Sequence, residues 1–143
     1  MFEKILVAID KSDITNKILD ATVEISLNKK TQVTLVNVCH VYVSNGLTYI
    51  PENFLEELLN EIEKASLEQL HQAKSKLASA GIKTETVHLK GDPAHEILNY
   101  AKDTAQQLII IGSRGLSGIK EMMLGSVSHK VSQLSSCPVL IVH

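Results

Sequence analysis

Short strand-like segments alternate with helix-like segments along the whole chain, and this alternation constrains the fold more than any other feature. Continuous apolar runs such as Ile5-Leu6-Val7-Ala8-Ile9 are typical of strands that are buried on both faces of a sheet. The segments expected as strands are 5–9, 33–38, 84–89, 108–111 and 139–142. Strands that alternate with helices form parallel sheets with right-handed crossovers and helices on both faces. The sequence therefore predicts an α/β fold.

Helix signals separate these strands. Leucine, isoleucine and alanine recur at three- and four-residue steps over residues 53–80, and Gly81 is suited to end that helix in a left-handed conformation. Asp92 and Pro93 form a typical helix start, with an acidic cap followed by proline in the first turn. Ser12 or Asp13 could cap the first helix. Residues 39–53 are expected to form a long connection.

A glycine-bearing loop follows the fourth strand and leads into the last helix. Gly112-Ser113-Arg114-Gly115 leaves the apolar run 108–111, and Gly125-Ser126 precedes a helix-like stretch over 127–134. Glycine permits positive φ and close approach of backbone N–H groups, and a helix N-terminus adds free donors and a positive dipole. The pattern predicts a phosphate-binding site. The alternative is that these glycines only shape a tight loop.

Asp10 and Gly112 each come directly after an apolar strand, so both are expected at the carboxyl edge of the sheet. Ligands bind outside this edge, where the winding of the sheet reverses. The two residues meet there if strands one and four are neighbours, which the sequence pattern alone leaves open.

These motifs resemble the universal stress protein family, and the resemblance covers essentially the whole chain. It is clearest over 5–10, over Gly91-Asp92-Pro93-Ala94 and over 108–142. It implies one domain spanning 1–143, with a Rossmann-like, five-stranded parallel sheet in the order 3-2-1-4-5. It further implies an ATP-binding member, with AMP or ADP as alternatives and Mg²⁺ as the expected companion ion. The nucleotide-binding residues implied by position are Asp10, Val38, Ile111, Gly112, Arg114, Gly115, Gly125, Ser126 and Val127.

Several of these positions have simpler interpretations. Asp10 could hold ribose hydroxyls or water-bound Mg²⁺, or it could be a helix cap or a loop acid. Val38 could meet the adenine edge through its backbone or be a core valine, and Arg114 could contact phosphate or be solvated. The Ser126 hydroxyl could contact phosphate or cap the following helix. Lys11 stands where many relatives have glycine, which affects the expected affinity more than the existence of the site.

Composition narrows the function classes. The net charge of -2 and the aromatic content of 3% argue against a nucleic-acid partner. There is no apolar run near 18 residues and no signal-peptide pattern, so neither a membrane partner nor secretion is expected. Cys39 and Cys137 fit no metal spacing and are expected as reduced thiols, which favours a cytoplasmic location.

The sequence shows no P-loop, no GxGxxG fingerprint, no nucleophile elbow and no histidine cluster with metal-ligand spacing. A nucleotide site without an evident general base favours binding over turnover, so no catalytic residue is assigned. The leading hypothesis is a regulatory ATP-binding protein of the stress response, and the alternative is a slow ATPase or phosphotransfer enzyme using the same pocket. The apolar final strand, 139–142, carries no charge to protect an edge, which predicts a homodimer paired through it. A downstream protein partner is not identified by the sequence.

Overall fold

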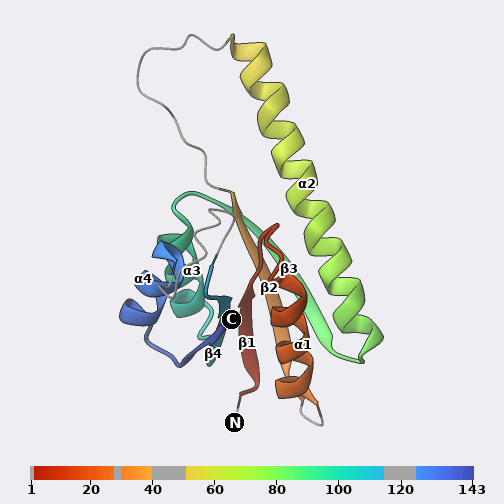
Figure 1. Ribbon diagram of the computed structural model, residues 1–143, viewed down its shortest axis with the longest axis vertical. Coiled ribbons are helices and arrows are strands. Elements are labelled where there is room, and N and C mark those ends of the chain that lie inside the picture. Colours follow the sequence, from red (N-terminus) through yellow and green to blue (C-terminus); the bar gives the residue numbers. More distant parts are fainter. Residues whose placement is uncertain (1, 28–29, 40–50, 115–124) are drawn as a thin grey trace.

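A computed structural model describes residues 2–27, 30–39, 51–114 and 125–143 of the chain. Strands and helices alternate as the sequence predicts (Figure 1). The strands are β1 (Lys4–Ala8), β2 (Gln32–Cys39), β3 (Lys83–Lys90), β4 (Leu108–Gly112) and β5 (Val139–Val142). The helices are α1 (Thr15–Ser26), α2 (Glu52–Ser79), α3 (Pro93–Asp103) and α4 (Ser126–Leu134).

The strands form one five-stranded parallel sheet in the order β3-β2-β1-β4-β5. β1 is central, with Ile5 beside Val33 of β2 and Leu108 of β4. The order and the α/β class implied by the resemblance are therefore confirmed. Because β1 and β4 are neighbours, the winding reverses between them, and at that point Asp10 follows β1 and Gly112 ends β4.

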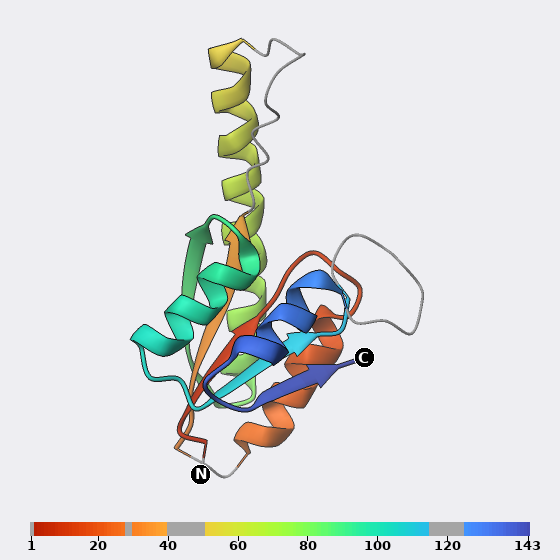
Figure 2. The same ribbon diagram turned by 90° about the vertical axis from the view of Figure 1, so that its left-hand side faces the viewer.

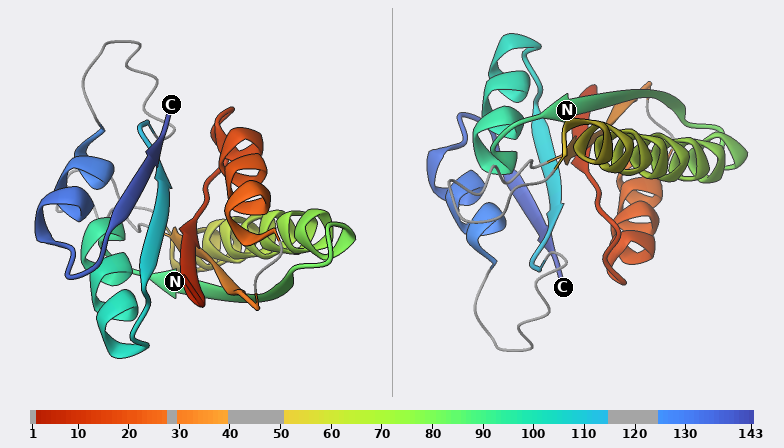
Figure 3. Two further views of the ribbon diagram at one scale, coloured as in Figure 1. Left: turned by 90° about the horizontal axis from the view of Figure 1, so that it is seen from below. Right: turned by 90° about the horizontal axis from the view of Figure 1, so that it is seen from above.

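Alternate residues of the strands enter two separate cores, one on each face of the sheet. Ile5 and Val7 of β1 pack with α1 and α2, whereas Leu6 and Ala8 pack with α3 and α4. Figure 3 shows this arrangement along the sheet, with one pair of helices on either side. Ile5, Leu6 and Val7 are each fully buried, as expected for a strand that is covered on both faces.

The helix ends follow the sequence signals in two cases out of three. Gly81 has φ +79° after α2, and the Asp92 carboxylate accepts a hydrogen bond from the His95 N–H at 3.0 Å at the start of α3. The expectation that Ser12 or Asp13 caps α1 is wrong. The helix begins after Ile14, which makes no side-chain cap, because the preceding residues are folded into a turn around Asp10.

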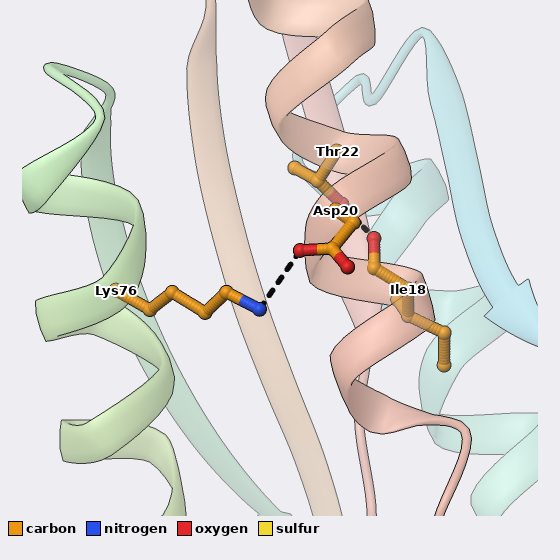
Figure 4. A network of polar contacts seen from close by, with 4 residues as sticks. All are labelled: Ile18, Asp20, Thr22 and Lys76. Carbon is orange, nitrogen blue, oxygen red and sulfur yellow. Dashed lines mark hydrogen bonds and ion pairs between the residues drawn. The ribbon is translucent and has the colours of Figure 1, made fainter.

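α2 is longer than the strands that it covers. Its C-terminal half buries Ser66, Leu70, Ala73 and Leu77, and its N-terminal half extends past the carboxyl edge of the strands (Figures 1 and 2). At the other end, Lys76 pairs with Asp20 of α1 at 2.8 Å on the surface (Figure 4). Within the described ranges, no helix has the length and apolar character needed to cross a bilayer.

Candidate functional site

A cavity of about 650 Å³ opens at the carboxyl edge of the sheet, between the ends of β1, β2 and β4 and the start of α4. Pockets of about 300–1,000 Å³ are typical of small-molecule sites. Eight of the nine predicted site residues line it: Asp10, Val38, Ile111, Gly112, Arg114, Gly125, Ser126 and Val127. The ninth, Gly115, lies outside the described residues. The structure thus brings together residues from four separate parts of the chain.

Asp10 is held in a fixed position two residues after β1. Its Oδ1 atom accepts a hydrogen bond from the Ser12 N–H at 2.8 Å, and its carbonyl oxygen accepts one from the Thr15 hydroxyl at 2.7 Å. It is therefore a loop acid that closes its own turn, not the cap of α1. The other carboxylate oxygen of Asp10 has no hydrogen-bond partner among the described residues, and Asp10 lines the cavity. That oxygen can accept hydrogen bonds from a ligand.

A polar network that the sequence analysis missed connects this turn to β2 and α2. The Asn37 amide donates to the Ile9 carbonyl at 3.0 Å and to Gln69 Oε1 at 3.3 Å, while its Oδ1 accepts from the Ser66 hydroxyl at 2.6 Å. Gln69 in turn donates to the Asp10 carbonyl. Asn37 and Ser66 are buried, so each bond also satisfies a group that would otherwise lose its water. The signal was available, since Asn37 interrupts an apolar strand and Ser66 lies on the apolar face of a helix.

The other side of the cavity is the start of α4. Gly125 is the N-cap, and the first intrahelical bond runs from the His129 N–H to the Gly125 carbonyl at 2.9 Å. The N–H groups of residues 126–128 precede that bond, so helix geometry leaves them without an intrahelical acceptor. All three residues line the cavity. Free donors and the positive end of a helix dipole therefore border the same cavity as Asp10.

One of the two interpretations of Ser126 is now excluded. The Ser126 hydroxyl does not cap α4, because Gly125 is the N-cap and no side-chain cap forms. Ser126 is exposed and borders the cavity, so its hydroxyl remains available. The hydroxyl that braces the helix start belongs to Ser128, which donates toward the carbonyls of Ser113 and Gly125, each at 3.1 Å.

The expectation that these glycines supply positive φ is wrong for Gly112 and Gly125. Gly125 has φ −59°, and the glycines of the described residues that have positive φ are Gly81 and Gly91. Close packing is the reason for glycine instead. A Cβ at Gly112 would lie 2.9 Å from Ile14 Cγ2, and one at Gly125 would lie 3.3 Å from the Ser113 carbonyl oxygen. The Gly125 N–H also donates to that oxygen at 2.7 Å, which fixes α4 against the end of β4.

Charged side chains of both signs line the cavity. Asp10 and Asp92 contribute carboxylates, and Lys11 and Arg114 contribute cations. Lys11 and Arg114 are exposed, so their charges lie at the rim and are screened by solvent. The cavity can thus hold a molecule with a polar, anionic end and an apolar body, since Val36, Ile97 and Ile111 form much of the remaining wall.

The comparison with known families agrees with the topology. The model of the universal stress protein family matches residues 1–143. The chain belongs to the universal stress protein family. Universal stress protein YxiE of Bacillus subtilis is 51% identical to it, over 99% of both chains. Among solved structures, hypothetical protein MJ0577 has a TM-score of 0.88 and 30% identity, over 99% of this chain and 96% of that one.

Other universal stress proteins have been solved with adenine nucleotides bound. One is a complex with cAMP, with a TM-score of 0.73 and 23% identity, covering 99% of this chain and 97% of that one. Another, from Archaeoglobus fulgidus, is a complex with dAMP, with a TM-score of 0.68 and 23% identity, covering 99% of this chain and 98% of that one. At this level of identity the likeness to the present universal stress protein is one of fold.

Proposed function

We propose that this universal stress protein binds an adenine nucleotide, ATP in the first place, and acts as a regulatory binding protein in a stress response. The observation that carries the proposal is the cavity at the reversal point of the sheet, which is lined both by Asp10 and by the residues with the free N–H groups of α4. Relatives that bind cAMP and dAMP support the choice of an adenine nucleotide. Free thiols at Cys39 and Cys137 support a cytoplasmic location.

Each part of a nucleotide has a chemically suited counterpart in the cavity. The free carboxylate oxygen of Asp10 suits ribose hydroxyls, and the backbone at Val38 suits the edge of adenine. The N–H groups of residues 126–128, together with the Ser126 hydroxyl, suit phosphate. Ile111, Gly112 and Arg114 border the same end, and Gly115 completes the predicted loop.

Magnesium is proposed as a companion of the phosphates. Among the described residues, no three His, Cys, Asp or Glu side chains lie close enough together to form a protein-only metal site. Mg²⁺ is commonly held by one or two carboxylates plus substrate phosphates and water. Asp10 fits that requirement, and its carboxylate would complement the charge of the ion.

The decisive experiment is to denature the purified protein and identify the nucleotide that it releases. Release of intact ATP would support a regulatory binding protein. Titration calorimetry of the stripped protein with ATP, ADP and AMP, with and without Mg²⁺, would then confirm the preferred nucleotide. ADP that accumulates above the level found with a Gly125→Val control would instead support the slow ATPase. No released nucleotide and no heat of binding would overturn the proposal.

We also propose a homodimer that is paired through β5. This strand is at the edge of the sheet, and its residues Val139–Val142 are apolar and only partly buried. A two-fold contact between two such edges would pair the exposed N–H and C=O groups of both copies. Light scattering after gel filtration tests this: a mass near 15.7 kDa would reject the dimer, and a dimer that Ile141→Lys converts to monomer would support it.

A further inference from the structure

The N-terminal half of α2 has an apolar stripe that no described part of the protein covers. Phe54, Leu55, Leu58 and Ile62 follow one another at helical spacing, and they form what we call the bare stripe. Phe54 is 58% exposed, and Leu58 and Ile62 are each 41% exposed. Figures 1 and 2 show this half of α2 standing beyond the sheet. Leu58 and Ile62 stand in the same four-residue row as Ser66 and Leu70, which are buried lower on the helix.

Half of an amphipathic helix gains little stability when its apolar face has no packing partner. Isolated helices are marginal in water, and most helical stability comes from packing of the apolar face. The stripe has the spacing of residues that anchor a helix against another helix or in a groove. A packing partner for residues 54–62 would therefore complete α2 along its whole length.

Carboxylates border the bare stripe on both sides. At 100° per residue, Glu57 and Glu61 follow one margin, and Glu52 and Glu63 lie toward the other margin, beyond Leu59. The single cation between residues 52 and 70, Lys64, lies beside Glu57, so the first margin has two carboxylates and one cation. Glu63 pairs with Lys90 of β3 at 3.6 Å, so the second margin already accommodates one cation.

This charge pattern selects among possible occupants. A second copy of the stripe would place carboxylates against carboxylates whether the two helices ran parallel or antiparallel, because both margins are acidic. Like charges that face each other across a helix pair are destabilising and act against that pairing. An apolar helix with Lys or Arg on both margins has the complementary pattern.

We propose that the bare stripe is a docking surface for a basic amphipathic helix of another protein. The apolar anchors of the two helices would pack together, and the carboxylates on both margins would pair with the cations of the partner. Ile62 belongs both to the bare stripe and to the wall of the cavity, so the docking surface is continuous with the proposed nucleotide site. Recognition by the stripe does not depend on the identity of the nucleotide.

The test uses the full chain and a fluorescent helical peptide of about three heptads, with leucine along its seam and lysine on both margins. Fluorescence anisotropy is expected to show saturable binding that weakens as salt is raised. Leu58→Ser is expected to weaken binding by about tenfold or more, as loss of a central apolar anchor commonly does. Glu57→Gln combined with Glu61→Gln is expected to reduce the salt dependence.

Leu67→Ser is the matched control, since Leu67 is 50% exposed on the same helix but lies off the stripe. It should leave peptide affinity within about twofold of wild type, while circular dichroism confirms that both variants stay folded. Equal binding by the Leu58→Ser and wild-type proteins would overturn the proposal, as would equal binding of a glutamate-margined or scrambled peptide. So would a failure of the wild-type protein to bind, which is expected if the chain covers its own stripe. A Leu58→Ser protein that loses an oligomer in light scattering would also overturn it, in favour of a second copy.

Discussion

The two sides of the cavity are built in different ways. On the Asp10 side, side chains hold the backbone, through the bonds among Asn37, Ser66, Gln69 and the carbonyls of Ile9 and Asp10. On the α4 side, the Gly125 N–H bonds directly to the Ser113 carbonyl, and the Ser128 hydroxyl supports that contact. The first side is therefore held mainly by side chains, whereas the second depends on a close backbone contact at a glycine.

This difference separates stability from ligand affinity. A buried hydrogen-bond network contributes to folding whether or not a ligand is bound, because each lost partner leaves a desolvated polar group. A helix N-terminus with free N–H groups contributes little to folding but interacts strongly with an anion. We expect changes on the Asp10 side to lower mainly stability, and changes at the start of α4 to lower mainly affinity.

Gly112→Val should have the largest effect, and it should act through the packing of β4 against α1 rather than through either side of the cavity. The new Cβ would lie 2.9 Å from Ile14 Cγ2 and 3.2 Å from Ile18 Cδ1, in a core that cannot easily expand. We expect the free energy of unfolding to fall by about 3 kcal/mol, at the upper end of typical overpacking effects. Urea denaturation measures it. Adding Ile14→Ala should restore part of the loss, and no recovery would mean that the clash is not with α1.

Gly125→Val should greatly weaken nucleotide binding, with a smaller loss of stability than Gly112→Val because its expected contact with the Ser113 carbonyl is less close. The side chain would stand at the N-cap, beside the free N–H groups of residues 126–128, and would crowd an incoming phosphate. We expect affinity to fall by about a hundredfold or more, equivalent to about 2.7 kcal/mol. Titration calorimetry with ATP measures this. Unchanged affinity in a folded variant would show that phosphate does not bind at α4.

Gln69→Ala should lower the free energy of unfolding more than it lowers nucleotide affinity, the reverse of Gly125→Val. It removes the donor to the Asp10 carbonyl and the acceptor of one Asn37 N–H. We expect a loss of about 1–2 kcal/mol in the free energy of unfolding. ATP affinity should fall only severalfold. Gln72→Ala, an exposed glutamine on the same helix, is the control and should change neither quantity. A Gln69→Ala protein with wild-type stability would remove the distinction between the two sides.

Lys76→Ala should have the smallest effect. Lys76 and Asp20 join α2 to α1 on the surface, with side chains that are 40% and 66% exposed (Figure 4). Exposed ion pairs contribute at most about 1 kcal/mol and are often worth less than that. We expect a change within about 0.5 kcal/mol and no change in nucleotide affinity. A larger loss of stability or of nucleotide affinity would mean that the surface link between α1 and α2 supports the site as well as the Asn37 network does.

The sequence predicted the sheet well because its signals are local and periodic. Buried runs such as 5–9 and 108–111 became β1 and β4, and Gly81 and Asp92 end and begin helices as their conformational preferences require. The start of α1 was missed because the backbone turn around Asp10 replaced a side-chain cap. The order of the strands came from resemblance, since no local signal specifies which strands become neighbours.

The candidate site was predicted less completely. The loop glycines and Asp10 were found by residue type and spacing. The reason why glycine is needed at positions 112 and 125 was not found, because the close contacts with Ile14 and with the Ser113 carbonyl form only on folding. The same holds for Asn37, Ser66 and Gln69, which are far apart in sequence and become one network only when α2 lies across β2. The capping alternative for Ser126 was excluded by where the helix begins, which sequence specifies only to within a few residues.

The central place of β1 also has a consequence for synthesis. β1 leaves the ribosome before the other strands of this sheet, yet its partner on one side is β4, so Ile5 cannot pair there until Leu108 has been synthesised. Pairings between such distant segments slow folding, and chains that are still incomplete expose apolar edges on which they can aggregate. A nascent chain that ends before residue 108 therefore has its most buried strand half paired. Release or stalling at that length is expected to yield insoluble protein, whereas chains that extend past β4 can close the sheet.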